Sequence, residues 1–500
     1  MTPLPDHIPG YGKVTPHTGR IATLFPAKQP RAPVNTRRTA TFQQAIVNAR
    51  LTDGATLSFH HHLRNGDQVM HMVLTACRDA GLRDLHIAPS SLFPCHAALI
   101  PFLQDGTITR ITTSYMIGPL ADAVRAGALK HPAVLQTHGG RAYAIESGRL
   151  PVNVAFIAAP AIDRAGNLTG AIGPQACGPL GYAMVDAAYA GHVIAVTDHE
   201  AEKLPRICIP AQRVDQIVRL DSIGSAAQIV SGTTGRAPSD AGQLIAAQTA
   251  QLIAASGLLC DGFSFQTGAG GTSLAVAKAI GPLMSERGIT GDFTAGGITA
   301  AHVEMLRGGL FRQIWDVQAF DLDAVASYRD DPLHHAMSAS DYASPARPNA
   351  IANRLDVMIL GAAEIDTDFN VNVTQASDGR IIGGSGGHAD TAACAKLPIV
   401  TTTLTAGGYP KIVRDLTCLT TPGTNIGAVV TESGIAIHPE RAELAKGARS
   451  AGLPVTDIDT LRQRAETLCP PRPQMPASGR IVAICEYRDG SVLDVIRADT

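Results

Sequence analysis

Aromatic side chains are scarce in this chain of 500 residues, where Phe, Tyr and Trp make up 4% and Trp occurs once. Flat platforms on which bases or sugars stack are therefore not expected. An excess of either charge is also missing, since 41 Lys and Arg residues face 43 Asp and Glu residues. Binding along a phosphate backbone needs a basic face, so this balance argues against nucleic acid as the main partner.

Cysteine pairs and long apolar runs are missing as well. The nine cysteines are scattered, and none stands in a C-x-x-C pair, which disfavours both a disulfide framework and a zinc ribbon. No stretch approaches about 18 uninterrupted apolar residues, and the first residues lack the basic and then apolar pattern of a leader peptide. We therefore expect a soluble protein of the reducing cytoplasm that binds no membrane.

The composition allows a large folded core, because apolar residues make up 45% of the chain and charged residues only 17%. A chain of this length is expected to form about two to four domains. Residues 1–40 are rich in Pro, Thr and basic side chains without periodicity, and they predict an extended N-terminal arm. Beyond the arm, short apolar runs at 154–157 and 357–360 alternate with helical patterns such as 239–257. This alternation predicts α/β domains with mainly parallel sheets.

The second half of the chain repeats the first. The segment at 161–167 recurs at 364–370, and the segment at 103–106 recurs at 306–309, both displaced by 203 residues. Agreement in order and spacing favours a duplication over chance matching. We therefore expect two homologous open α/β domains, at 41–230 and 236–500, joined near 231–235.

Polar and glycine-rich segments stand where the first strand of each half should turn into a helix, the place at which open α/β sheets bind ligands. The first half has His60, His61, His62 and Arg64 there. Consecutive residues of a strand point to opposite faces, so the three histidines are not expected to hold a metal ion. They and Arg64 are candidates to donate hydrogen bonds to a polyanionic small molecule, or they are histidines satisfied by backbone at a strand end.

The second half has a glycine loop at the corresponding place, made of Gly268, Ala269, Gly270 and Gly271. Its bare backbone amides could bind an oxyanion or phosphate, or the loop is a purely structural turn. A second glycine loop, at 383–390, surrounds one Ser with four glycines. The amides of Gly386 and Gly387 would suit the tetrahedral oxyanion of acyl transfer.

Five segments together resemble the citrate lyase alpha chain family. They are SFHHHLRNGD at 58–67, QTHGGRAY at 136–143, GAGG at 268–271, WDVQAFD at 315–321 and YRDGSVLDV at 487–495. The resemblance extends from about residue 35 to residue 500. Its parent superfamily is similar to the type I coenzyme A transferases, which have two like α/β domains and an active site between them.

The resemblance implies a transferase in which citrate displaces acetate from an acetyl-thioester on an acyl carrier protein, or on coenzyme A, to give a citryl-thioester. It implies an oligomer with a beta (lyase) subunit and a gamma (acyl carrier) subunit. No tightly bound cofactor is implied, because the thioester arrives on the carrier arm or on coenzyme A.

The resemblance also assigns roles to residues. It makes the Gly386 and Gly387 amides the oxyanion hole and Asn372 or Asn370 the contact to the thioester. Arg64, the histidines at 60–62 and His388 would bind carboxylates, and the loop at 268–271 would hold the thiol-bearing arm.

The sequence departs from thioester-exchanging relatives in one respect. Those relatives have a nucleophilic Glu shortly after a Gly-Ile pair, whereas here Gly297-Ile298 precedes Thr299, Ala300 and Ala301. The nearest acid, Glu304, is offset by about three residues. This departure predicts that citrate itself attacks the thioester to give a mixed anhydride. The alternatives are an acyl-CoA hydrolase or Glu-dependent CoA transferase, and a noncatalytic scaffold subunit.

Overall fold

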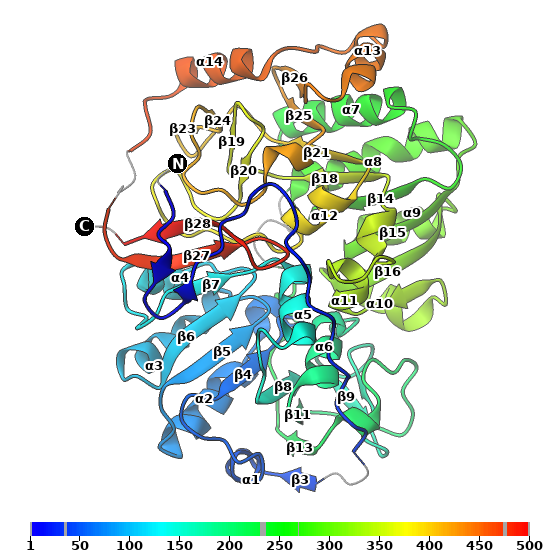
Figure 1. The fold of residues 1–500 in the computed structure, drawn as a ribbon. Coiled ribbons are helices and arrows are strands. Elements are labelled where there is room, and N and C mark those ends of the chain that lie inside the picture. The colour runs from blue at the N-terminus through cyan, green and yellow to red at the C-terminus, as the bar shows by residue number, and fades with distance from the viewer. Residues whose placement is uncertain (1–2, 35–37, 231–236, 269, 474–477, 499–500) are drawn as a thin grey trace.

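Two large sheets organise the chain, of which the computed structural model describes residues 3–34, 38–230, 237–268, 270–473 and 478–498 (Figure 1). The first sheet has the order β28-β27-β7-β6-β5-β4-β8-β11-β13-β3. Its strands are β3 (Arg38–Ala40), β4 (Thr56–Phe59), β5 (Leu85–Pro89), β6 (Ile108–Thr113), β7 (Ala133–Leu135), β8 (Val154–Ala158), β11 (His192–Thr197), β13 (Gln216–Arg219), β27 (Ile481–Glu486) and β28 (Val492–Arg497).

The second sheet has the order β17-β16-β15-β14-β18-β21-β25-β26. Its strands are β14 (Ser264–Thr267), β15 (Gly291–Ile298), β16 (Phe311–Ala319), β17 (His334–Ala336), β18 (Val357–Leu360), β21 (Leu397–Thr401), β25 (Ala428–Thr431) and β26 (Gly434–Ile437). Within the two large sheets every pairing is parallel except β27 with β28 and β25 with β26. The predicted α/β class is confirmed.

The duplication is visible in the topology. Strands β7-β6-β5-β4-β8-β11-β13 of the first sheet and β17-β16-β15-β14-β18-β21-β25 of the second follow the same chain order. Each half also has a small sheet, in which an antiparallel pair is joined by a parallel third strand. These small sheets are β9 (Ala161–Asp163), β10 (Leu168–Thr169) and β12 (Glu200–Ala201), and β19 (Glu364–Asp366), β20 (Val371–Asn372) and β24 (Ile412–Val413).

Helices cover the sheets and complete two main hydrophobic clusters, one that contains residues of both halves and one formed within the second half. In the first half they are α1 (Phe42–Asn48), α2 (Val69–Asp79), α3 (Ile100–Gln104), α4 (Pro119–Arg125), α5 (His138–Ser147) and α6 (Gly181–Tyr189). In the second they are α7 (Asp240–Ala255), α8 (Gly271–Glu286), α9 (Ala300–Arg307), α10 (Leu322–Asp330), α11 (Ala339–Ala343), α12 (His388–Cys394), α13 (Ala442–Ser450) and α14 (Ile458–Leu468). None of the helices in the described ranges is long and apolar enough to cross a membrane.

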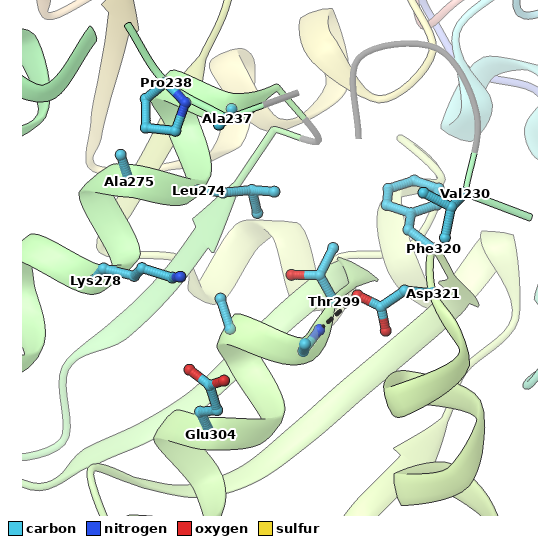
Figure 2. A pocket seen from close by; sticks show the side chains of 13 residues that line it. Val230, Ala237, Pro238, Leu274, Ala275, Lys278, Thr299, Glu304, Phe320 and Asp321 are labelled. Carbon is cyan, nitrogen blue, oxygen red and sulfur yellow. Dashed lines mark hydrogen bonds between the residues drawn. The ribbon is translucent and has the colours of Figure 1, made fainter. Parts of the chain in front are cut away.

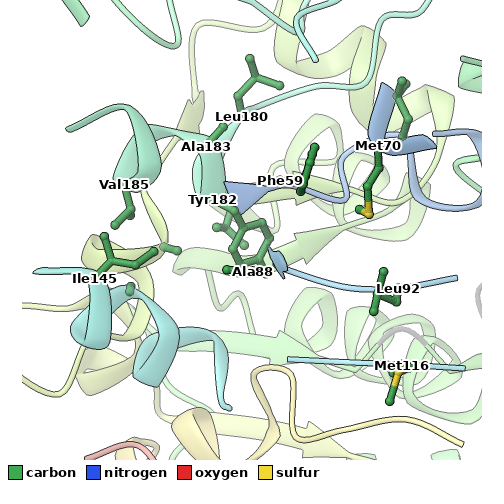
Figure 3. Packing of buried hydrophobic residues seen from close by; sticks show 14 of the residues in the cluster. Phe59, Met70, Ala88, Leu92, Met116, Ile145, Leu180, Tyr182, Ala183 and Val185 are labelled. Carbon is green, nitrogen blue, oxygen red and sulfur yellow. The ribbon is translucent and has the colours of Figure 1, made fainter. Parts of the chain in front are cut away.

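Local sequence explains where these helices begin, and burial explains where they lie. The Ser239 hydroxyl accepts from the Gly242 amide and so caps α7, as Ser does at many helix starts. Figure 3 shows part of the first core, in which Phe59 of β4, Ala88 of β5 and Tyr182 of α6 belong to one buried cluster. This packing fixes the ends of β4 and β5, from which the site is built.

The C-terminal segment does not follow the expected domain boundary. Residues 236–500 are expected from the sequence to form the second domain, but β27 and β28 extend the first sheet, with Ala483 opposite Ala133 of β7 (Figure 1). The final strands therefore return across the molecule. The arm expected at 1–40 contributes β3 to the far end of the first sheet. It also forms a hairpin of β1 (His7–Ile8) and β2 (Gly12–Lys13), whose Ile8 packs with Ile484 and Val492.

Candidate active site

The carboxyl ends of the two parallel sheets face each other. Thr137, just after β7, pairs as a β-bridge with Gly386 of the second glycine loop. The side-chain amide of Gln318, near the end of β16, donates to the backbone carbonyl of His61, which follows β4 (3.1 Å). Ligands bind open α/β sheets beyond these strand ends. The place where the halves meet is therefore the candidate site.

The histidine segment that follows β4 is buried at this boundary. The His61 amide donates to Ser90 Oγ (3.0 Å), and His61 Nδ1 lies 2.5 Å from the same oxygen. The His61 ring lies 5.6 Å from that of His138 and 4.7 Å from that of Tyr182. His62 stacks on His61 at 6.1 Å, and in the described part of the chain its ring nitrogens have no hydrogen-bond partner. We call His61, His62, His138 and Tyr182 the aromatic cluster.

Burial keeps these imidazoles neutral. It lowers the pKa of His60 to about 4 and that of His138 to about 3. Burial also lowers the pKa of His61 and His62 well below the usual value, and neighbouring imidazoles add to the shift. Neutral imidazoles still donate one hydrogen bond each. An anion placed among them would favour their protonation and raise these pKa values.

Arg64 lies beside the aromatic cluster in a left-handed backbone conformation, with φ of 51°. Its guanidinium carbon is 5.1 Å from the centre of the Phe93 ring and 4.7 Å from that of Phe320, which belongs to the second half. Burial lowers the pKa of Arg64 to about 10. The group therefore stays charged at neutral pH and presents a cation at the domain boundary.

A buried carboxylate ties three of the recognised segments together. Asp390 accepts from the Thr137 hydroxyl (2.8 Å), the Gly139 amide (2.7 Å) and Arg488 Nε (3.0 Å). The Arg488 fork also reaches the Ala343 carbonyl. Segments separated by about 250 residues thus meet at one point, and the Asp390 contacts fix the glycine loop of the second half against the first.

The glycine loop at 383–387 is shaped largely by this packing. A Cβ on Gly384 would lie 2.4 Å from the Ser114 carbonyl, so the close approach excludes other residues there. The Gly386 amide, expected in the oxyanion hole, donates to the Ser114 carbonyl (3.0 Å), and the Gly386 carbonyl accepts from the His138 amide (2.7 Å). Within the described residues the Gly387 amide has no acceptor. Gly387 is therefore the amide of this pair that can serve an oxyanion.

The two asparagines are occupied by their own chain. Asn372 is fully buried, donates to Glu364 (3.0 Å) and the Gln375 carbonyl (2.7 Å), and accepts from two amides. Asn370 donates to Asp366 (2.9 Å) and accepts from the Gly423 amide (2.8 Å). Asn372 therefore has no hydrogen-bonding capacity left for a thioester, whereas Asn370 keeps one amide proton and one acceptor position. Both side chains have a role in turn geometry.

His388 is also used internally. Its Nδ1 lies 2.8 Å from Thr421 Oγ1, and its Nε2 lies 2.9 Å from the Gly361 carbonyl, which can only accept. Burial lowers the pKa of His388 to about 4. The neutral ring therefore bridges two loops, with Nε2 protonated, and is not positioned to bind a carboxylate.

A cavity of about 380 Å³ opens beside the first glycine loop (Figure 2). The Gly268 amide donates to the Ile359 carbonyl (2.8 Å), Gly270 precedes α8, and Gly271 starts it. Ala269 lies outside the described residues. Gly271 lines the cavity together with apolar side chains and three charged ones. The lining side chains include Leu274, Ala275, Lys278, Glu304, Phe320 and Asp321.

Phe320 forms the wall between this cavity and Arg64, since it lines the one and contacts the other. Figure 2 shows Lys278 of α8 and Glu304 of α9 on the same side of the cavity, away from Phe320. Glu304 is exposed, as expected for a residue on the outer face of its helix. Its carboxylate nevertheless faces the predicted thioester pocket.

Sequence reasoning missed several residues of the site: His138, Tyr182, Gln318, Asp390 and Arg488. Four of them stand inside segments that carried the resemblance or the glycine loop, so their position was known but not their role. Tyr182 stands in no motif, and only its packing against three histidine rings reveals it. Among the described residues, no three metal-binding side chains gather as a metal site would require.

Comparison with known proteins decides the family. The model of the citrate lyase alpha subunit family matches residues 35–498. This chain belongs to that family. The citrate lyase alpha chain of Escherichia coli K12 is 43% identical over 462 residues, which are 91% of this chain and 90% of the relative. The Klebsiella pneumoniae alpha chain is 42% identical over 457 residues, with the same shares covered.

Solved structures agree. The Streptococcus mutans alpha subunit of citrate lyase, solved in complex with citrate, matches with a TM-score of 0.92 and 40% identity, over 96% of this chain and 95% of that one. A Pseudomonas malonate decarboxylase hetero-tetramer matches with a TM-score of 0.64 and 17% identity, over 86% of each chain. At that identity the second likeness shows the fold alone.

Proposed function

We propose that this chain exchanges acyl groups between a thioester and citrate, so that citrate displaces acetate from an acetyl-thioester on an acyl carrier protein or on coenzyme A. The observation that carries the proposal is the meeting of the family's segments at the domain boundary. There Asp390 holds Thr137, Gly139 and Arg488 together, next to Arg64 and the aromatic cluster. Family membership over 35–498 supports the same reaction.

The proposed chemistry needs no carboxylate of the enzyme. A citrate carboxylate attacks the thioester carbonyl carbon, and the Gly387 amide donates to the developing oxyanion. The thiolate leaves, and a citryl-acetyl anhydride remains. The same thiolate then attacks the citryl carbonyl, and acetate leaves with the electron pair of the broken bond. The enzyme contributes positioning and electrostatic stabilisation.

Arg64 and neighbouring imidazoles are suited to hold the remaining citrate carboxylates. Arg64 is charged and 8% exposed, and charge-assisted hydrogen bonds are strongest where water is scarce. The thiol-bearing arm would occupy the 380 Å³ cavity, along Gly271, Leu274 and Phe320.

A second candidate is a Glu-dependent coenzyme A transferase, and one observation favours it: Glu304 lines the same cavity as Gly271. In that mechanism the Glu304 carboxylate would attack the thioester and carry the acyl group or the thiol carrier in turn. Such an enzyme would form a covalent adduct before any acceptor arrives and would show ping-pong kinetics.

One experiment separates the two mechanisms. The purified chain is incubated with acetyl-CoA alone, treated with hydroxylamine and analysed by peptide mass spectrometry; acetate release is then followed while acetyl-CoA and citrate are both varied. We expect intersecting, sequential kinetics, no modified carboxylate at Glu304, and at most a modest loss of kcat in Glu304→Gln. An adduct at Glu304 with parallel, ping-pong plots would establish the second mechanism. If the chain releases no acetate under any condition, the remaining interpretation is a noncatalytic scaffold subunit.

The other subunits and the compartment belong to the same proposal. Citrate lyase alpha chains are named as one chain of an enzyme with further chains, and we propose that this chain assembles with a lyase subunit and an acyl carrier subunit. We place the reaction in the cytoplasm. All nine cysteines are unbridged, even Cys418 and Cys485, whose Sγ atoms lie 3.5 Å apart, and such thiols persist in a reducing compartment.

A further inference from the structure

A second cavity lies under the N-terminal hairpin, away from the site described above. It is open to solvent on one side, has a volume of about 560 Å³ and is lined by β1, the segment that enters β7, the start of β27 and the end of β28. Apolar and basic side chains line it. They are Pro5, His7, Ile8, Pro9, Lys130, His131, Pro132, Arg480, Ile481 and Arg497, with the backbone of Gly10 and Gly479.

Only cations and neutral groups line this cavity among the described residues, although acids and bases balance over the whole chain. Arg480 donates to the carbonyls of Gly127 (3.0 Å) and Lys130 (2.9 Å), and Arg497 donates to the Gly479 carbonyl (2.8 Å). Carbonyls orient a guanidinium without neutralising it. In the described part of the chain, neither arginine has a carboxylate within 4.0 Å.

The remaining cations are weakly compensated. The Lys130 side chain is 65% exposed, and its ammonium lies 3.8 Å from Asp84, which also pairs with Arg110. The pKa of His131 is lowered, by burial and then by Arg110 and Lys130, which is the expected effect of a positive field on an imidazole. A dianion or trianion in the cavity would relieve this repulsion.

The hairpin that lines the cavity is built to stay in place. Gly10 has φ of +82°, and a Cβ there would lie 2.2 Å from His131 Nδ1, so only glycine allows this approach. Ile8 is 1% exposed and packs with Val14, Ile484 and Val492. This packing anchors the hairpin, and with it one side of the cavity, to the first sheet.

Its position separates it from the proposed reaction. The cavity lies at the amino ends of β7 and β27, whereas Gln136 and Thr137, at the carboxyl end of β7, lead to the aromatic cluster. A ligand here would contact the segment that precedes β7, and Thr137, just after β7, pairs with Gly386 of the second glycine loop. The strand gives a direct physical connection between the two places.

We propose that this cavity binds a polyanionic small molecule, a polyphosphate or a polycarboxylate, at a site distinct from the site of acyl exchange. The cations would contact its oxygens, and the proline and isoleucine side chains would cover its less polar part. The inference concerns binding alone and stands whether or not the acyl exchange proposed above is correct.

The test uses the full chain and two probes, inorganic tripolyphosphate and citrate, in separate calorimetric titrations at low salt. The double variant Lys130→Gln/Arg497→Gln removes two cations of the cavity. The matched control, Lys446→Gln/Arg449→Gln, makes the same charge change on the exposed face of α13. The single variant Lys130→Gln, at an exposed side chain, serves if the double variant fails to fold.

We expect tripolyphosphate binding to weaken by about tenfold or more in the double variant and by less than about twofold in the control, since each lost contact is charge-assisted. If citrate is the ligand, the double variant loses one citrate site per chain relative to the wild type. If phosphates alone bind, the citrate stoichiometry is the same in both proteins. Equal tripolyphosphate affinity in the wild type and the double variant, with citrate binding also unchanged, would overturn the proposal.

Discussion

Substituting Asp390 by Asn tests the central contact of the domain boundary. The carboxylate is fully buried and accepts three hydrogen bonds, including one from Arg488 Nε at 3.0 Å. Burial raises the pKa of Asp390, while Arg488, the Gly139 amide and Thr137 oppose that shift. Asn preserves the volume but removes the charge, and its amide nitrogen faces a donor whichever way it is turned.

The expected cost follows from what is left behind. Arg488 is 4% exposed and would lose its only carboxylate partner among the described residues. Breaking one side of a buried ion pair typically costs about 3–5 kcal/mol. We therefore expect Asp390→Asn to lower the free energy of unfolding by about 3 kcal/mol or more. Acyl exchange should fall as well, because Asp390 also holds Thr137 and Gly139.

The assay is denaturant unfolding followed by two signals. Trp315 is the only tryptophan and lies in β16 of the second half, so its fluorescence reports that half, whereas circular dichroism reports the whole chain. Arg488→Met and the double variant complete a double-mutant cycle, for which we expect a coupling of about 2 kcal/mol or more. A loss below about 1 kcal/mol in Asp390→Asn, or additive effects in the cycle, would refute the reasoning.

Three further outcomes are expected. Gly387→Val should lower kcat by about 10²-fold, the scale of one oxyanion donor, because its Cβ would lie 2.8 Å from Tyr342 Oη; unchanged acetate release would place the oxyanion hole elsewhere. Arg64→Gln should raise the citrate KM by about tenfold with little change in kcat, whereas an effect on kcat alone would assign Arg64 to the transition state. Burial lowers the pKa of His96, but hydrogen bonds to Asp67 and Cys95 more than offset it and raise the pKa to about 9. Because this folded pKa exceeds the usual 6.5, the contribution of the His96–Asp67 contact to stability is complete below pH 6.5 and is lost as pH rises through 9. An equal alkaline loss in Asp67→Asn, measured by thermal unfolding, would contradict this.

Much of the fold could be predicted from the sequence because the signals are local and repeated. The apolar run at 357–360 forms strand β18 with the same bounds, and the helix expected after Ser239 is α7. The 203-residue displacement correctly predicted two halves with one strand order. The place of β27 and β28 could not be predicted in this way, because pairing with β7 joins residues about 350 positions apart.

The site was harder to predict than the fold, because hydrogen bonds within the chain decide which polar side chains remain available to bind a ligand. An amide such as Asn372 looks the same in the sequence whether its four hydrogen-bonding positions are filled or open, and here they are filled. Gly384 and Gly386 suggested a ligand-binding loop, yet packing on Ser114 explains much of their requirement. The histidine segment was found by its composition, and its partners His138 and Tyr182 only by the fold.

The duplication supplies an internal control for Asn370, whose predicted contact with the thioester can be tested against its copy. Asn370 donates to Asp366 (2.9 Å) and accepts from the Gly423 amide (2.8 Å). Asn167 donates to Asp163 (2.7 Å) and accepts from the Ala211 amide (2.8 Å). The same contacts in both halves point to a shared structural role, since the first half has no glycine loop like 383–387. We expect Asn370→Ala and Asn167→Ala each to cost about 1–3 kcal/mol in stability and to leave kcat nearly equal. If kcat falls about tenfold or more in Asn370→Ala but not in Asn167→Ala, and the two variants have the same thermal midpoint, Asn370 contacts the thioester after all.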